Sequence, residues 1–129
     1  NTHANAGFSD AQPWLPVKAP QAVNAVAQQM DDGILAYYKS MIAMRKNSPV
    51  LSHGNTLFVD LPEPLLAFTR HYEGKSLTCA FNLSKDAHSI YLTGAAELFH
   101  GQAANLTEDT LTLDGNGFAY LSHAGAVPI

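Results

Sequence analysis

The chain has 129 residues, of which 47% are hydrophobic and 14% charged, which suits one domain with a packed core and excludes wholesale disorder. Seven basic against eleven acidic residues give a net charge of -4, and no stretch concentrates the basic ones, which excludes the electrostatic footprint of a nucleic-acid-binding protein. No apolar run approaches the ~20 residues of a membrane span, and no signal-peptide pattern opens the chain, so we expect a soluble, cytoplasmic protein without a membrane partner.

Residues 1–30 are rich in Ala, Asn, Gln and Pro and have no sustained period. Pro13, Pro16 and Pro20 favour extended backbone around them. Two interpretations stay open for this segment, a disordered leader or an extended arm that lies on a surface with Phe8 and Trp14 as anchors. Large aromatic side chains are uncommon in solvated linkers, which favours the arm.

A helix is predicted over residues 32–47. Asp31 or Asp32 can cap its first amide groups, and the basic pair Arg45-Lys46 suits its last turn. The triplet Asn47-Ser48-Pro49 ends it. Its apolar arc covers about half of the circumference, wider than the ~100° stripe that one neighbouring layer needs, so it indicates either two packing partners or one generous core face. The arc contains Ile34, Leu35, Tyr37, Tyr38, Met41, Ile42 and Met44.

From Thr56 onward the hydrophobic period changes to two, which is typical of strands. Two alternating runs, 66–72 and 77–83, flank Glu73-Gly74-Lys75 and predict a β-hairpin. In the second run Leu77, Cys79, Phe81 and Leu83 share one apolar face, opposite Thr78, Ala80 and Asn82. Shorter runs lie before this hairpin, at 57–60, and after it, at 89–92, 96–99, 110–113 and 118–122. Seven short strands with frequent turns indicate a mainly β fold, an antiparallel β-sandwich.

The sequence lacks a self-sufficient catalytic or metal-binding motif. Gly115-Asn116-Gly117 is expected to be a turn between two strands, not a phosphate-binding loop. Cys79 is expected to be a buried structural thiol, since it lies on an apolar strand face. Two triplets, Asn82-Leu83-Ser84 and Asn105-Leu106-Thr107, match the glycosylation pattern but have no secretory context. The six histidines do not have the spacing of a zinc site; they are His3, His53, His71, His88, His100 and His123.

Several segments in order resemble a known enzyme family. They are Asn5-Ala6-Gly7-Phe8, Pro13-Trp14-Leu15-Pro16-Val17, Met44-Arg45-Lys46, the linker 49–54 and Phe81-Asn82-Leu83-Ser84. Together they resemble the closing part of the α-glucosidases and oligo-1,6-glucosidases of the α-amylase superfamily. In that family a loop and the last helix of a TIM barrel lead into a C-terminal β-sandwich.

The resemblance implies a retaining glycoside hydrolase whose Asp nucleophile, Glu acid/base and supporting Asp lie on barrel strands that this sequence does not match. We therefore assign no catalytic residue, metal ligand or cofactor here, and leave substrate-binding residues unassigned. Residues 1–54, with the helix at 32–47, are expected to be a remnant of the barrel domain, and residues 55–129 the sandwich domain. The expected function is a non-catalytic C-terminal portion that covers and stabilises the catalytic barrel of an enzyme for short α-glucosides.

Two further hypotheses accompany this one. Without its barrel, the chain is expected to associate with itself through the exposed helix face, or to fold its arm over that face, because Tyr37, Met41, Met44 and Trp14 would be left partly uncovered. Alternatively, the sandwich is a carbohydrate-binding module, which requires exposed aromatic side chains on one sheet face. The candidates for that face are Phe58, Tyr72, Tyr91, Phe99, Phe118 and Tyr120.

Overall fold

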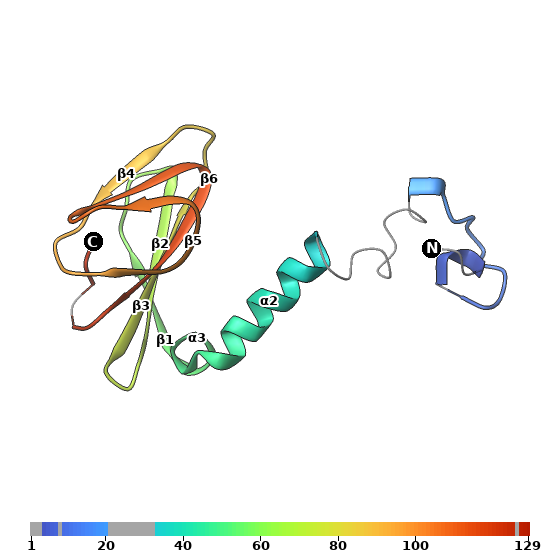
Figure 1. Ribbon diagram of the computed structural model, residues 1–129, viewed down its shortest axis with the longest axis horizontal. Helices are drawn as coiled ribbons and strands as arrows, with labels where there is room; N and C mark the ends of the chain where they lie inside the picture. The colour runs from blue at the N-terminus through green and yellow to red at the C-terminus, as the bar shows by residue number, and fades with distance from the viewer. Residues whose placement is uncertain (1–3, 8, 21–32, 126) are drawn as a thin grey trace. The chain divides into compact units, whose positions relative to one another are not determined.

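The computed structural model describes residues 4–7, 9–20, 33–125 and 127–129, and divides the chain into two compact units, Asn1–Asn47 and Ser48–Ile129 (Figure 1). In the first unit, the 3-10 helix η1 spans Ala4–Gly7 and helix α2 spans Ile34–Asn47. The side-chain amide of Asn5 donates hydrogen bonds to the carbonyl oxygens of Ser9 and Ala11, at 2.8 and 2.9 Å. These bonds tie η1 to the chain at residues 9–11. The expected anchor Phe8 and the expected caps Asp31 and Asp32 lie outside the described residues.

The predicted end of the first helix is confirmed, because α2 ends at Asn47 with Arg45 and Lys46 in its last turn. A short helix that was not predicted, α3 (Pro49–His53), begins directly afterwards. Ser48 is its N-cap and accepts a hydrogen bond from the Leu51 amide at 3.4 Å. Proline ends one helix but is favoured in the first turn of the next, so Pro49 has both effects here.

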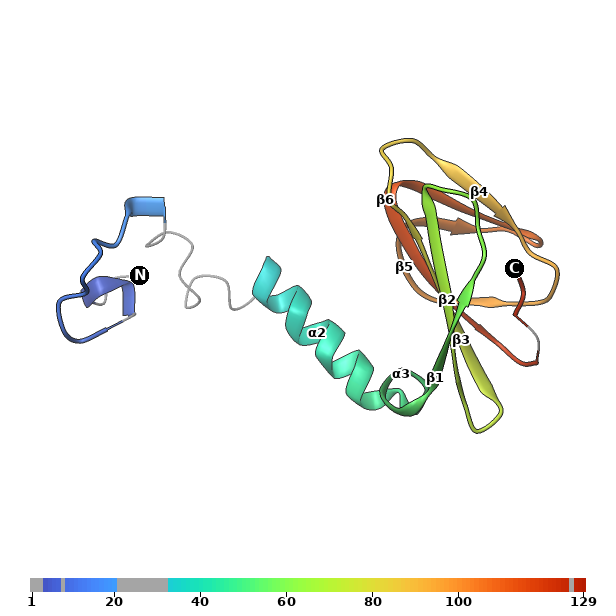
Figure 2. The same cartoon turned by 180° about the vertical axis from the view of Figure 1, so that it is seen from behind.

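The second unit contains one antiparallel sheet of six strands that curls into two layers (Figure 2). The strand order is β1-β2-β3-β6-β4, and β5 also pairs with β6. This mainly β architecture confirms the predicted antiparallel sandwich. The strands are β1 (Asn55–Val59), β2 (Leu65–Tyr72), β3 (Lys75–Asn82), β4 (His88–Tyr91), β5 (Glu97–Leu106) and β6 (Thr110–His123).

The predicted hairpin is confirmed by the pairing of β2 with β3, in which Tyr72 lies opposite Lys75. Its two-residue turn has Glu73 at φ 47° and Gly74 at φ 77°. Positive φ at both central residues is the mark of a type I′ turn, whose twist matches that of the flanking strands.

The predicted turn at Gly115-Asn116-Gly117 is wrong, and with it the count of seven strands. Residues 110–113 and 118–122 belong to a single strand, β6, which continues through residues 114–117. On the neighbouring strand, Ala104 pairs with Leu113 and Gln102 pairs with Phe118, so Ala103 alone lies opposite these four residues. The segment is therefore a large bulge, and β5 also continues beyond its predicted end to Leu106.

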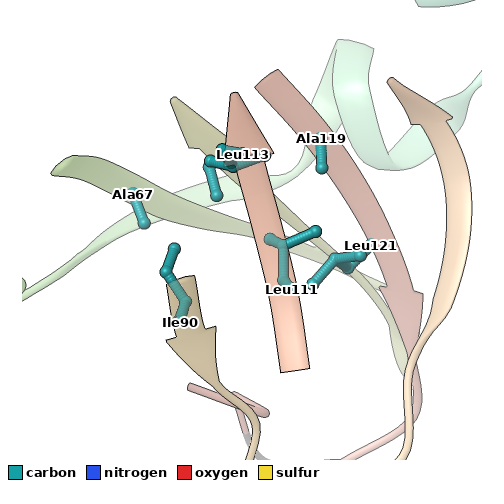
Figure 3. Packing of buried hydrophobic residues seen from close by; sticks show 7 residues of the cluster. Ala67, Ile90, Leu111, Leu113, Ala119 and Leu121 are labelled. Carbon is teal, nitrogen blue, oxygen red and sulfur yellow. The ribbon is translucent and has the colours of Figure 1, made fainter. Parts of the chain in front are cut away.

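The bulge creates the two layers. Before it, β6 lies between β4 and β5; after it, β6 lies between β3 and β5. The layers enclose a small aliphatic core from β2, β3, β4 and β6, shown in part in Figure 3. Its members are Ala67, Ala80, Ile90, Leu111, Leu113, Ala119 and Leu121.

Both faces of β3 are buried along most of its length: Leu77 and Cys79 on the apolar face are 4% and 1% exposed, and the opposite face belongs to the aliphatic core. Ala80 belongs to the core cluster, so Thr78 and Asn82 share its inner face, and all three are buried. The polar side chains are accommodated by hydrogen bonds, among them one of 2.7 Å between the hydroxyls of Thr69 and Thr78. Phe81 is on the outer face and is half-buried.

Candidate interaction surface

Aromatic side chains from five strands form a continuous row on the outer face of the larger layer. Strand register brings them together: Phe58 lies opposite Phe68, Phe81 opposite Phe118, and Tyr120 opposite His100. Successive rings are in contact, with centroids 5.4–6.2 Å apart. We call this set, Phe58, Phe68, Phe81, Phe118, Tyr120 and His100, the aromatic row.

The aromatic row is only partly covered. Phe58 on the edge strand β1 is 70% exposed, and the other five side chains are half-buried. The rings of Phe68, Phe81 and Phe118 stack in sequence, with interplanar angles of 25–26°. Each of these rings therefore turns part of its face toward a neighbour. A half-exposed strip of this kind, apolar apart from the Tyr120 hydroxyl and the His100 imidazole, stabilises contacts by burial.

Helix α3 covers one end of the same outer face. Arg70 of β2 holds it there by donating to the carbonyl oxygens of Val50, at 3.4 Å, and Leu51, at 3.2 Å. Its guanidinium also donates to the Thr56 hydroxyl at 2.6 Å. Both Val50 and Leu51 are buried, so α3 packs onto the sheet through its apolar side. The outer face is thus covered by α3 at one end and only partly covered along the aromatic row.

Three of the six aromatic residues predicted for a sugar-binding face lie in the aromatic row: Phe58, Phe118 and Tyr120. The other three do not. Tyr72 packs against His53 at 5.7 Å, whereas Tyr91 on β4 and Phe99 on β5 are exposed outside the row. Phe68, Phe81 and His100 were not among the predicted candidates for this face, because the cross-strand register that aligns them is not visible in one strand at a time.

Five of the six histidines lie within the described residues. Within the described residues, no group of three or more His, Cys, Asp or Glu side chains could hold a metal ion. His3 lies outside them. Two of the others have structural hydrogen bonds, His71 to the Ser76 hydroxyl at 2.9 Å and His123 to the Thr78 hydroxyl at 2.8 Å.

Asn82 is part of a buried hydrogen-bond network and is not an accessible glycosylation acceptor. Its side-chain amide donates to the carbonyl oxygens of Asp86, Leu113 and Asp114, at 2.7, 3.2 and 2.9 Å. Its side-chain oxygen accepts from the backbone amide and the hydroxyl of Ser84, at 3.0 and 2.9 Å. The residue therefore ties the end of β3 to the bulge of β6.

Cys79 is a free, buried thiol, as predicted, and is 1% exposed. Burial raises its pKa from 9.0 to about 12, with only partial opposition from the positive charge of Arg70. Between these values the folded thiol keeps its proton while the unfolded thiol loses it, so its contribution to stability decreases as the pH rises above 9.

We expect the folded chain to react far more slowly with Ellman's reagent than the urea-unfolded chain at pH 8. The raised pKa alone lowers the thiolate population roughly a thousandfold, and burial blocks access as well. Release of the coloured thiolate measures both rates. Equal rates in the folded and unfolded chains would contradict the assignment of a protected thiol.

Among the residues that the structure describes, no helix is long and apolar enough to cross a membrane. Residues 1–54 match the family model of the α-amylase catalytic domain. A probable α-glucosidase of Rhizobium meliloti is 38% identical over 85 residues, which are 64% of this chain and 15% of the relative. An oligo-1,6-glucosidase of Heyndrickxia coagulans is 37% identical over 90 residues, which are 67% of this chain and 16% of the relative.

Two solved structures contain a region whose fold is similar to that of this chain. The α-glucosyl transfer enzyme XgtA matches 91% of this chain and 23% of its own, with a TM-score of 0.79 and 32% identity. The trehalulose synthase MutB from Pseudomonas mesoacidophila MX-45 matches 95% of this chain and 24% of its own, with a TM-score of 0.75 and 22% identity, which supports the fold alone. The chain therefore spans about a sixth of the length of the curated relatives and about a quarter of these structures.

Proposed function

Because the chain is related to the α-glucosidases and oligo-1,6-glucosidases of the α-amylase family, we propose that it is the non-catalytic C-terminal portion of a retaining α-glucosidase. The enzyme would act on short α-glucosides. The observation that carries the proposal is the division of the chain: residues 1–54 match the catalytic-domain model, and the strands of the sandwich all follow them. A domain boundary after residue 54 and a cytoplasmic location stay predictions.

The role of this portion would be to cover and stabilise the catalytic barrel. Helix α2 supports this role, because none of its side chains is buried although half of its circumference is apolar. Tyr37 is 44% exposed and Tyr38 is 63% exposed, whereas Met41 and Met44 are half-buried. Trp14, in the segment that resembles a barrel loop, is 92% exposed. Such side chains need a partner surface, which the last helix of a barrel would find in the rest of the barrel. Self-association of the isolated chain stays a prediction.

We expect the chain alone to release no p-nitrophenol from p-nitrophenyl α-glucoside above the rate in buffer. Retaining hydrolysis requires two carboxyl groups about 5–5.5 Å apart at the scissile bond, and the proposal places both on the barrel. The intact XgtA enzyme is the positive control for the assay. Turnover by the chain alone would contradict the proposed function.

A chimera tests the proposed role directly. The residues of XgtA that match this chain are replaced by it, and α-glucosyl transfer is compared with that of XgtA and of XgtA lacking those residues. We expect the chimera to transfer glucosyl groups and the shortened enzyme to be inactive or insoluble. A chimera that is soluble and folded but inactive would contradict the proposal.

A further inference from the structure

Building on the proposed function, we infer that the aromatic row is the surface on which the sandwich docks against the catalytic barrel. The partner is an apolar protein surface, in continuation of the contact that α3 already makes. The docking surface is one face of the sandwich and consists of this one set of side chains. The opposite layer around β4 is not part of it.

The position of α3 beside the aromatic row indicates which protein surface covers the row. Helix α3 lies within residues 1–54, the part of the chain that matches the catalytic-domain model, and it packs on the outer face through Val50 and Leu51. One end of this face is therefore already covered by a segment that matches the catalytic-domain model, although α3 belongs to the same compact unit as the sandwich, and the hydrogen bonds from Arg70 fix it there. An apolar surface that continues directly from such a contact is best covered by more of the same domain.

Charge and exposure agree with a protein partner. The row contains no Asp, Glu, Lys or Arg, and it ends at Phe58, whose ring is 70% exposed at the edge of the sheet. Aromatic side chains are enriched and charged ones depleted at the centre of protein interfaces. On the opposite layer, by contrast, the large exposed apolar residue of β4 is the single Tyr91.

A sugar ligand is less well matched to this face. Sugars bind against open ring faces with polar groups beside them, whereas Phe68, Phe81 and Phe118 stack on one another. Arg70, two residues after Phe68 and so on the same face of β2, already donates to α3 and Thr56. The row can bury apolar area against a protein but has few free groups to bind hydroxyls.

The neighbours Phe58 and Leu57 provide a matched pair of test variants. Both are on the edge strand β1 and similarly exposed, at 70% and 65%, but they point to opposite faces, since Phe58 pairs with Phe68 and Leu57 with Thr69. Phe58→Asp and Leu57→Asp are introduced into the chimera with XgtA and into the isolated chain. In the chimera we expect Phe58→Asp to speed thermal inactivation about tenfold relative to Leu57→Asp, because a carboxylate would be buried at the interface. In the isolated chain both variants should melt at similar temperatures.

The outcomes separate the two proposals. Equal inactivation rates for the two variants in an active chimera would overturn the docking surface and leave the proposed function standing. A folded but inactive unsubstituted chimera would contradict both. Calorimetric titration of the isolated chain with isomaltose tests the sugar alternative, and binding that Phe58→Asp abolishes would also overturn the docking surface.

Discussion

Replacing Gly115 by alanine is expected to destabilise the sandwich by about 3 kcal/mol or more, which is the cost of a backbone clash in a packed region. A Cβ atom at this position would overlap the carbonyl oxygen of Lys85 and would lie 2.6 Å from its carbonyl carbon. Backbone atoms cannot rotate away as a side-chain end can. The loop and the bulge are also held together directly, since the Asn116 amide donates to the Ser84 carbonyl oxygen at 2.8 Å. The clash would therefore separate β6 from the loop that follows β3.

The measurement is urea unfolding followed by circular dichroism, with Gly94→Ala as the matched control. A Cβ atom at Gly94 would meet only Pro128, at 3.8 Å, which is an ordinary contact. We expect this control to remain within about 0.5 kcal/mol of the parent chain. Similar unfolding midpoints for the two variants would contradict the close approach at Gly115.

The same bulge shows where sequence-based prediction failed. The run Asp114-Gly115-Asn116-Gly117 has the composition of a tight turn, so local composition alone predicts a turn here. Long-range contacts overrule it, because β5 pairs on both sides of the segment while Lys85 and Ser84 pack against it. In contrast, the β2–β3 hairpin could be predicted because its turn and its pairing are both local.

The outer face of β3 shows a second limit. The side with Leu77, Cys79 and Phe81 is the more apolar in the sequence, yet the aliphatic core lies on the side of Ala80. On the more apolar side, α3 covers one part and the aromatic row occupies the rest. A sequence pattern records how much burial a face needs but not which element provides it, so the two apolar faces of such a strand cannot be told apart from the sequence alone.

The buried amide of Asn82 is expected to matter as much as a large core side chain. It is 2% exposed, and it satisfies three backbone carbonyl groups and two donors of Ser84 at the junction of β3 and the bulge. In Asn82→Ala these groups lose their partner, and the carbonyl oxygen of Leu113 loses it in a buried position. We expect a loss of about 3 kcal/mol in the free energy of unfolding, since each unsatisfied buried group costs about 1–3 kcal/mol and some will find water.

Two further variants separate hydrogen bonding from side-chain volume. Asn82→Asp keeps the shape but replaces the donating amide by an oxygen that faces the carbonyls of Asp86, Leu113 and Asp114, so it should be at least as destabilising as alanine. Asn105→Ala removes an exposed asparagine from β5 and should stay within about 0.5 kcal/mol of the parent chain. The urea concentration at the midpoint of unfolding, measured for the three variants, distinguishes hydrogen bonding from side-chain volume as the source of the stability. If Asn82→Asp were as stable as the parent chain, the amide could not be the group that fastens β3 to the bulge.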